Sequence, residues 1–193
     1  FESSQVVDAF RHMSTGNHTG KVIVDMGGGV SPDALIRSVP DRLFGSTDTV
    51  LVTGGNSGIG FAIGRWVCER GSRHVILASR TAAIAPGLQS KFEALLARFP
   101  TLVVECVSLD VCDQEAVARQ FDARAAAGRP IRYVYHAATV YSACTALDVQ
   151  SLDATWDTKV VGAQNLIAAM RAQSGGVRQL TLISSLAAVH GNT

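Results

Sequence analysis

The chain has 193 residues, of which 47% are hydrophobic and 17% are charged, and its formal net charge is +1. This composition is too apolar for a disordered chain and suffices for the core of one domain of ordinary size. The small net charge gives no reason to expect nucleic acid or a membrane surface as a partner. No apolar run approaches the roughly 18 residues that a membrane span needs.

The four cysteines stand apart from one another in the sequence. None pairs with another at CxxC spacing, and no histidine lies at zinc-finger spacing from them, so we expect no metal site. Cys68 and Cys106 stand among apolar residues and are typical of small core side chains. We therefore expect a reducing, cytoplasmic setting. The cysteines are Cys68, Cys106, Cys112 and Cys144.

Residues 1–26 differ in pattern from the rest of the chain. Ser3 or Ser4 is placed to cap a short amphipathic helix that Gly16 would end. The sequence KVIVD, residues 21–25, predicts a strand. A helix and a strand cannot bury their apolar faces alone, so one interpretation is an N-terminal extension packed on the main domain.

Residues 27–48 are rich in Gly, Ser and Pro and predict a linker. Four apolar residues within it are candidates for docking against a neighbouring surface: Leu35, Ile36, Leu43 and Phe44. The chain starts at Phe1, without a Met or a signal sequence, and we expect it to be processed or cut from a longer protein.

A glycine-rich turn follows the first predicted strand of the main domain, which comprises residues 49–193. Val50–Val52 is a short apolar run typical of a buried parallel strand. A helix should follow, with this apolar face: Ile59, Ala62, Ile63, Trp66 and Val67. A glycine turn at a helix start lets the backbone approach a pyrophosphate, which the helix dipole favours. The alternative is a plain connector. The candidate residues are Thr53, Gly54, Gly55, Asn56, Ser57, Gly58, Ile59 and Gly60.

Strands and helices alternate through the rest of the chain. Strands are predicted over 75–78, 102–107, 131–136 and 180–184, and helices over 86–99, 113–127 and about 151–173, the last possibly broken. Repeated βα units predict an α/β fold, a Rossmann-like doubly wound parallel sheet that is incomplete at its C-terminus. Ligands of such sheets bind beyond the carboxyl ends of the strands.

Arg80 and Ser79 close the second strand, about 20 residues after the glycine turn, where an NAD-binding fold places an acidic residue. A guanidinium at this position can instead bind a 2′-phosphate through two parallel hydrogen bonds. This favours NADP(H) as the cofactor. The alternative is an ordinary solvated arginine.

Two further strand ends carry candidate residues. Asp110 could accept a hydrogen bond from an adenine amino group, with Val111 against the ring, although a helix-capping role is the alternative and Asp113 suits capping better. His136 is followed by Ala137 and Ala138, whose small side chains leave room for a nicotinamide ribose. A histidine in such a setting is more often a hydrogen-bonded core residue than a catalyst.

Lys159 and Ser185 are the candidate catalytic residues. Lys159 stands between apolar residues in the last long helix, so it is either directed into a cleft or is a solvated helix lysine. Ser184 and Ser185 follow the fifth strand, and a serine there can bond a substrate carbonyl and stabilise the developing alkoxide.

The motifs TGGNSGIG, SR, LDV, HAA, KVVG and ISS, in this order, resemble the short-chain dehydrogenase/reductase family. More narrowly, they resemble the ketoreductase domain of polyketide and fatty acid synthases, especially the fungal highly reducing type. The resemblance covers residues 49–193. Before it, AFRHMSTGNHTGKVIV resembles the last helix and strand of medium-chain enoyl reductase domains, and such synthases place an enoyl reductase ahead of the ketoreductase.

The resemblance implies NADPH as the cofactor and a β-ketoacyl thioester on an acyl carrier protein as the substrate, with neighbouring synthase domains as partners. It assigns the 2′-phosphate to Arg80, the adenine to Asp110, and active-site roles to Lys159 and Ser185. The pyrophosphate falls to Gly54, Gly58 and Gly60. The family's proton donor, a tyrosine whose pKa the lysine lowers, would fall just beyond Thr193. We therefore expect a truncated piece that does not turn over alone.

The sequence also departs from the family pattern. The turn NSGIG is closer to that of stand-alone reductases, and Tyr141-Ser142-Ala143 replaces the LDD triplet that marks one stereochemical class. Two alternatives therefore stay open. One is a stand-alone short-chain reductase, and the other is a non-catalytic Rossmann domain that serves as a scaffold or nucleotide sensor.

Overall fold

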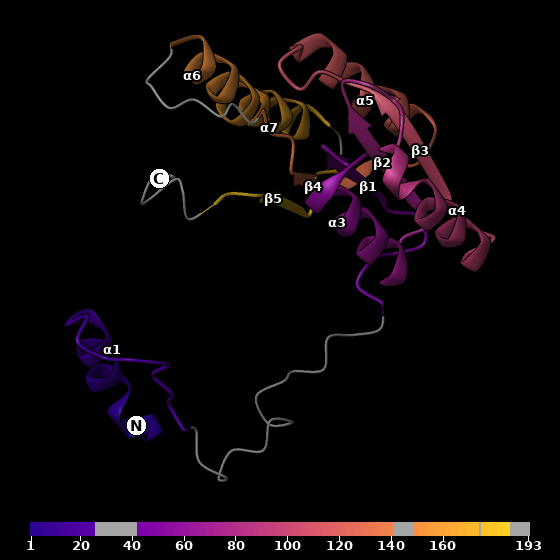
Figure 1. Cartoon of the computed structure of the whole chain (residues 1–193). Coiled ribbons are helices and arrows are strands. Elements are labelled where there is room, and N and C mark those ends of the chain that lie inside the picture. The colour runs from indigo at the N-terminus through magenta and orange to yellow at the C-terminus, as the bar shows by residue number, and fades with distance from the viewer. Residues whose placement is uncertain (26–41, 141–148, 174, 186–193) are drawn as a thin grey trace. The chain divides into compact units, whose positions relative to one another are not determined.

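The computed structural model describes residues 1–25, 42–140, 149–173 and 175–185. The chain divides into two compact units, Phe1–Pro40 and Asp41–Thr193. Figure 1 draws both, and each is described here by itself.

The second unit is built on a parallel sheet of five strands in the order β3-β2-β1-β4-β5. The strands are β1 (Thr49–Thr53), β2 (His74–Ser79), β3 (Val103–Ser108), β4 (Ile131–His136) and β5 (Gln179–Leu182). The chain builds outward from β1 to β3 and then returns to the other side of β1, so the strand order reverses between β1 and β4. The Rossmann-like parallel sheet predicted from the sequence is confirmed.

Helices cover both faces of this sheet, with α3 and α4 on one side and α5 and α7 on the other (Figure 1). Their bounds are α3 Gly58–Glu69, α4 Gln89–Arg98, α5 Gln114–Ala126, α6 Val149–Trp156 and α7 Gly162–Ala172. A 3-10 turn, η2 (Pro86–Leu88), precedes α4, and a π-helical segment, η3 (Asp157–Val161), joins α6 to α7. The predicted helix over 151–173 is therefore continuous but widened in the middle.

Alternate residues of β1 enter two hydrophobic cores. Val50 and Val52 face α3 and α4, whereas Leu51 faces α5 and α7, and all three side chains are fully buried. A strand that is buried on both faces reads as a continuous apolar run. For this reason the short run Val50–Val52 was a reliable indication of the central strand.

The buried face of α3 differs from the predicted one. Ile59 is 65% exposed and Trp66 is 36% exposed, whereas Phe61, outside the predicted face, is buried. Val67 is buried, as the sequence predicted. Gly64 is buried beside them, and a Cβ there would lie 2.6 Å from Leu77 Cδ2. The helix therefore packs close to the sheet through small residues. Because of this close approach, its buried face is rotated by about one residue from the face that the apolar periodicity predicts.

The helix cap predicted at Asp113 is confirmed. Its Oδ1 accepts a hydrogen bond from Ala116 N at 2.9 Å at the start of α5. This bond satisfies one of the backbone donors that a helix start leaves open.

The segment before β1 contributes to the second unit. Leu43 and Phe44 dock there, as the sequence predicted, and the Phe44 ring contacts Trp66 and Tyr133 edge-on. Asp48, which is buried, forms an ion pair with Arg178 at 3.0 Å. Leu35, Ile36 and most of the predicted linker lie outside the described residues.

The first unit contains a 3-10 turn, η1 (Ser3–Gln5), and helix α1 (Val6–Ser14). The predicted cap at Ser3 or Ser4 is wrong, because a capping box between Glu2 and Gln5 starts the turn. The predicted strand over 21–25 is also wrong. These residues form only an isolated bridge between Glu2 and Asp25, together with a hydrogen bond from the terminal ammonium of Phe1 to Ile23 O.

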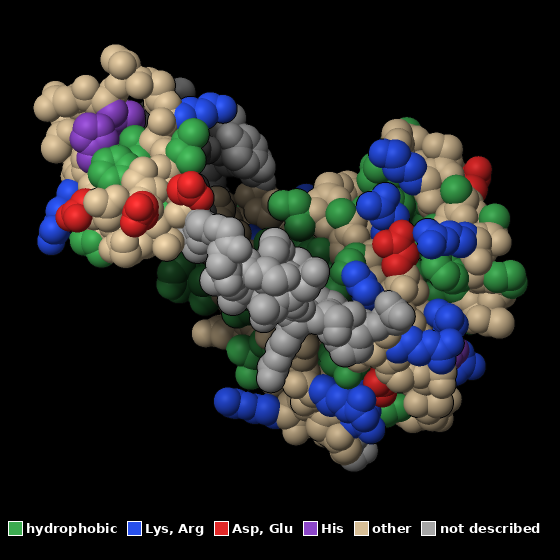
Figure 2. Space-filling view, turned by 90° about the horizontal axis from the view of Figure 1, so that it is seen from below, with side chains coloured by type: hydrophobic (Ala, Val, Ile, Leu, Met, Phe, Trp, Pro, Cys, Tyr) green, Lys and Arg blue, Asp and Glu red, His purple; other side chains and the backbone are tan. Residues whose placement is uncertain are grey.

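Figure 2 shows the kinds of side chain on one face of the molecule. On the first unit, histidine side chains lie beside hydrophobic ones, and the His12 ring centroid is 5.7 Å from that of Phe1. On the face of the second unit shown, basic side chains stand singly or in small groups. Among the described residues, no helix is long and apolar enough to cross a membrane.

Candidate cofactor-binding site

A cavity of about 510 Å³ lies at the carboxyl ends of all five strands. Thr53 ends β1, Ser79 ends β2, and Asp110, Ala138 and Ile183 follow β3, β4 and β5. This is where ligands bind in open parallel sheets, at the point where the strand order reverses. The cavity gathers all of the predicted site residues except Gly55 and His136.

The glycine turn has a shape that other residues would not adopt without strain. Gly54 has φ +68°, and a Cβ on it would lie 2.8 Å from Ala138 N. A Cβ on Gly60 would lie 2.1 Å from Gly54 O. Gly58 has φ +48° and open space where its Cβ would point. The backbone is thus packed tightly against the sheet on one side and is open to the cavity on the other.

Helix α3 begins directly at this open side. Its N-cap residue, Ser57, makes no side-chain capping hydrogen bond, and Ser57, Gly58, Ile59 and Gly60 all line the cavity. The first amide groups of a helix have no partner within it and carry the positive end of the dipole. An open turn with uncapped amides fits a pyrophosphate group.

Asn56 belongs to the turn, but its side chain supports the wall of the cavity. Its Nδ2 donates to Ala83 O at 2.9 Å, and its backbone carbonyl accepts from Ala85 N at 3.0 Å. These bonds hold the loop after β2 against the glycine turn. The sequence placed Asn56 among the cofactor contacts; the structure adds this supporting role.

Ser79 and Arg80 form the part of the cavity wall at the end of β2. The Arg80 side chain is exposed, and its backbone carbonyl accepts a hydrogen bond from Ser108 Oγ at 2.9 Å. The backbone is therefore fixed to β3, and Arg80 is part of the cavity wall. A cation in this wall suits an anionic group bound beyond the glycine turn.

Asp110 and Val111 occupy the loop after β3. Asp110 Oδ1 accepts from Cys112 N at 2.9 Å, which fixes the loop, and Val111 is buried. Helix α7 clamps this loop, because Asn165 Nδ2 donates to Val111 O at 3.0 Å and a Cβ on Gly162 would lie 2.6 Å from Val111 Cγ2. The sequence analysis included Gly162 in the KVVG motif but missed Asn165, whose contact with the loop after β3 no local pattern indicates.

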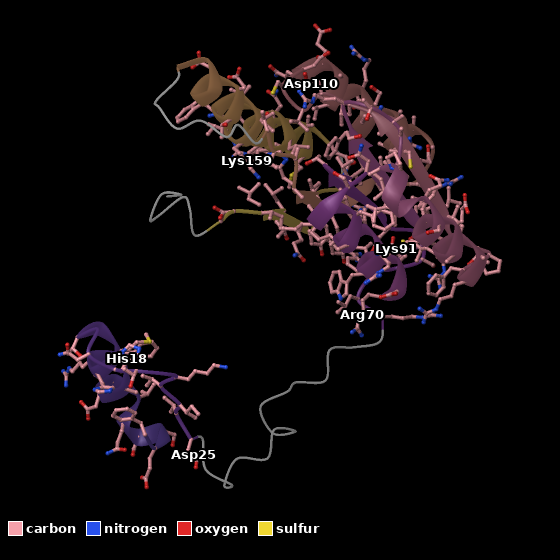
Figure 3. The ribbon with its side chains drawn as sticks, viewed as in Figure 1. His18, Asp25, Arg70, Lys91, Asp110 and Lys159 are labelled. Carbon is pink, nitrogen blue, oxygen red and sulfur yellow. The ribbon has the colours of Figure 1, made fainter. Side chains whose placement is uncertain are left out.

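Lys159 reaches the cavity from the π-helical segment η3. Its Nζ donates to Ile183 O at 3.0 Å, and Figure 3 shows the side chain directed from the helical segment toward β5. Burial lowers the pKa of the Lys159 ammonium. Ser184 and Ser185 line the same cavity. The structure thus favours the interpretation that Lys159 lies in a cleft, and π-helical turns are frequent at functional sites.

Two predicted site residues do not line the cavity. Gly55 is buried against the sheet, where a Cβ would lie 2.8 Å from Val52 O. His136 is 1% exposed and hydrogen-bonded on both sides, to Thr53 and to Thr158. Both positions face the packed interior. For His136 this agrees with the alternative that the sequence left open, a hydrogen-bonded core residue, and the cofactor contacts of Gly55 and His136 stay predictions. Among the described residues, no group of three metal-ligating side chains gathers anywhere.

The comparisons with known proteins agree with this geometry. The family model described as "KR domain" matches residues 48–193. The chain belongs to this family of ketoreductase domains. One similar solved structure is PlmKR1, the ketoreductase from the first module of phoslactomycin biosynthesis in Streptomyces sp. HK803. Its sequence is 31% identical to that of this chain. It superimposes with a TM-score of 0.67 over 80% of this chain and 36% of that one.

The curated relatives of this chain described here are synthases much longer than the chain itself. Prosolanapyrone synthase of Alternaria solani is 35% identical over 173 residues, which is 86% of this chain but only 6% of that synthase. Polyketide synthase GfsA of Streptomyces halstedii is 38% identical over 85% of this chain and 2% of its own length. A short-chain dehydrogenase of Brucella melitensis, 17% identical with a TM-score of 0.58, shares the fold. Family and fold are those of reductases that bind nicotinamide cofactors.

Replacing Gly60 by alanine tests the close approach within the turn. Because the new Cβ would meet the backbone carbonyl of Gly54, which cannot move as a side chain can, we expect Gly60→Ala to lower the free energy of unfolding by about 1–3 kcal/mol or more. Gly87→Ala is the matched control, since nothing lies within 4 Å of its Cβ position. Urea denaturation measures both variants, and equal stabilities would contradict the described turn.

The buried histidine makes stability depend on pH. Burial is the main cause that lowers the pKa of His136 below its ordinary 6.5, and the charge of Lys159 adds to it. The unfolded chain therefore binds a proton at His136 more readily than the folded chain does. For this reason the free energy of unfolding should fall as the pH falls below about 6.5. Burial also lowers the pKa of His74.

Thermal melting between about pH 7 and about pH 5 measures the effect. We expect the acid-dependent loss to be smaller in His136→Gln than in the wild type, and smaller than in His74→Gln, because His136 is the more buried of the two rings. An acid-dependent loss of the same size in all three proteins would contradict this assignment.

Proposed function

We propose that this chain is the cofactor-binding part of a ketoreductase domain that uses NADPH to reduce a β-ketoacyl thioester to the β-hydroxyacyl thioester within a polyketide synthase. The observation that carries the proposal is the single cavity that joins the uncapped glycine turn, Arg80, Lys159 and Ser185. Each of these features is common by itself. A cavity that holds all four suits a phosphate-bearing cofactor beside a carbonyl substrate.

Arg80 supports NADPH over NADH. Arg80 lines the cavity at the end of β2, where the ribose of a bound dinucleotide lies in this fold, and it stands where NAD sites place a carboxylate. A guanidinium forms strong charge-assisted bonds with a phosphate. Asp110 would accept from the adenine amino group at the next strand end.

Ser185 and Lys159 supply the groups that act on the substrate carbonyl. Bound NADPH would supply the hydride. Ser185 would donate a hydrogen bond to the carbonyl oxygen, whose negative charge grows during the reaction. The Lys159 ammonium would stabilise that charge. It would also lower the pKa of the proton donor, the tyrosine hydroxyl that the family resemblance implies beyond Thr193.

The partners that we propose follow from the size of the relatives. The chain spans about 6% or less of the first synthases that it matches, which are multidomain proteins. We infer that an acyl carrier protein presents the substrate and that residues 1–26 are the end of an enoyl-reductase-like domain, joined by a linker to the ketoreductase domain. A cytoplasmic setting remains part of this proposal and is supported by the free Cys68, Cys106 and Cys112.

Cofactor preference gives the first test. In Arg80→Ala we expect the affinity for NADPH to fall about tenfold or more while that for NADH is unchanged, because only the 2′-phosphate loses its charge-assisted bonds. Fluorescence titration of the chain measures both constants. Arg65→Ala on the exposed side of α3 is the control. An equal loss for both nucleotides would show that Arg80 does not bind the 2′-phosphate.

The carbonyl contact gives the second test. In the polypeptide in which this chain occurs, NADPH absorbance reports reduction of a β-ketoacyl thioester of N-acetylcysteamine. We expect Ser185→Ala to lower kcat by about 10²–10³ with little change in NADPH affinity, as removal of an oxyanion donor does. Ser184→Ala is the neighbouring control. A larger loss in Ser184→Ala would assign the contact to Ser184 instead.

A further inference from the structure

His136 lies next to the cavity without lining it, and its ring joins two of the cavity's supporting elements. It ends β4 and is 1% exposed. Nδ1 lies 2.7 Å from Thr53 Oγ1 at the end of β1, and Nε2 lies 3.0 Å from the backbone carbonyl of Thr158 in η3. The ring therefore connects the strand before the glycine turn to the helical segment that carries Lys159.

The partners of the ring fix its tautomer. A backbone carbonyl can only accept, so Nε2 must carry the hydrogen that Thr158 O receives. Burial holds His136 in its neutral form, since it lowers the pKa of the ring. Nδ1 then has a lone pair and accepts from the Thr53 hydroxyl. Thr53 Oγ1 in turn accepts from Ala138 N at 3.3 Å, so each donor in this chain has an acceptor.

A second route leads from His136 to the same lysine. The backbone carbonyl of His136 accepts from Ile183 N at 3.0 Å, and Ile183 O accepts from Lys159 Nζ at 3.0 Å. Thr158 and Lys159 are consecutive residues. Ring and backbone of His136 thus form a closed circuit of hydrogen bonds through β5 and η3, with Lys159 as a member.

This circuit restrains the Lys159 side chain and the helical turn that carries it. A lysine side chain loses up to about 2 kcal/mol of rotamer entropy when it is fixed, and a π-helical turn is less regular than the α-helix around it. A bond from outside the helix to the carbonyl just before Lys159 fixes the turn. The acceptor for Nζ is fixed by the neighbouring strand.

We propose that His136 is a positioning residue that, as the neutral Nε2–H tautomer, holds η3 against the ends of β1 and β4 and so sets the place of the Lys159 ammonium in the cavity. The importance of this placement for catalysis rests on the proposed function, whereas the hydrogen-bond circuit itself does not.

Nitrogen-15 NMR of the wild-type chain, labelled at histidine, tests the tautomer directly. We expect the ring signals assigned to His136 to show a protonated Nε2 and an unprotonated Nδ1 at neutral pH. The opposite tautomer, or a doubly protonated ring, would overturn the proposal without any variant.

Variants test the effect on Lys159. His136→Phe keeps a ring of similar size but removes both hydrogen bonds, whereas His136→Gln keeps a donor and an acceptor. We expect the Lys159 pKa, followed by NMR of the labelled lysine, to rise toward its ordinary value in His136→Phe and to stay near the wild-type value in His136→Gln. Loss of the circuit would leave Nζ more hydrated, and hydration favours the charged form.

Gln173→Met is the matched control. Gln173 is also buried and also bonds to β4, but at its other end, through Ile131 N at 3.1 Å and Ile131 O at 2.8 Å. We expect this variant to lose stability while the Lys159 pKa is unchanged. An unchanged Lys159 pKa in folded His136→Phe, or an equal rise in Gln173→Met, would overturn the positioning role.

NADPH titration of the same samples separates this proposal from the proposed function. A wild-type chain that binds no NADPH but shows the Nε2–H tautomer and the Lys159 response would reject the cofactor assignment alone. A wild-type chain that binds NADPH but has the other tautomer would reject the positioning role alone.

Discussion

The close approach of Gly60 to the backbone of Gly54 is the constraint on which the cavity depends. A Cβ at Gly60 would lie 2.1 Å from Gly54 O, so helix α3 starts in direct contact with the turn that precedes it. Gly64 continues this approach one turn later, over Leu77. The helix therefore lies low on the sheet, and its open amide groups face the carboxyl edge of the strands rather than solvent alone.

The order of the strands turns that edge into a cavity. Because the chain leaves β1 toward β2 and later returns to β4 on the other side, the connections after β1 and β4 diverge. The glycine turn and the pair Ala137 and Ala138 line this gap with small groups. Larger groups, Arg80 and Lys159, stand at its margins, where they can act on a ligand without filling the space.

Polar side chains hold the cavity wall in place by bonding backbone carbonyls. Asn165 bonds the carbonyl of Val111 in the loop after β3, Asn56 bonds that of Ala83 in the loop after β2, and His136 bonds that of Thr158. The side chains of Asn165 and His136 are buried and do not line the cavity, whereas Asn56 lines it. Such bonds matter because a buried polar group without a partner is costly, and they keep irregular backbone in one conformation.

The sequence by itself determined the parallel α/β fold, the position of the glycine turn, the strand ends that carry Arg80 and Asp110, and the family. These follow from local patterns, since the period of apolar residues and the position of glycines report on the adjacent backbone. Only the tertiary structure decided which face of α3 is buried, that residues 21–25 form no strand, and that His136 and Gly55 support the site from outside it. Those outcomes depend on packing between segments far apart in the chain, such as Thr53 with His136 and Asn165 with Val111, and no local period encodes them.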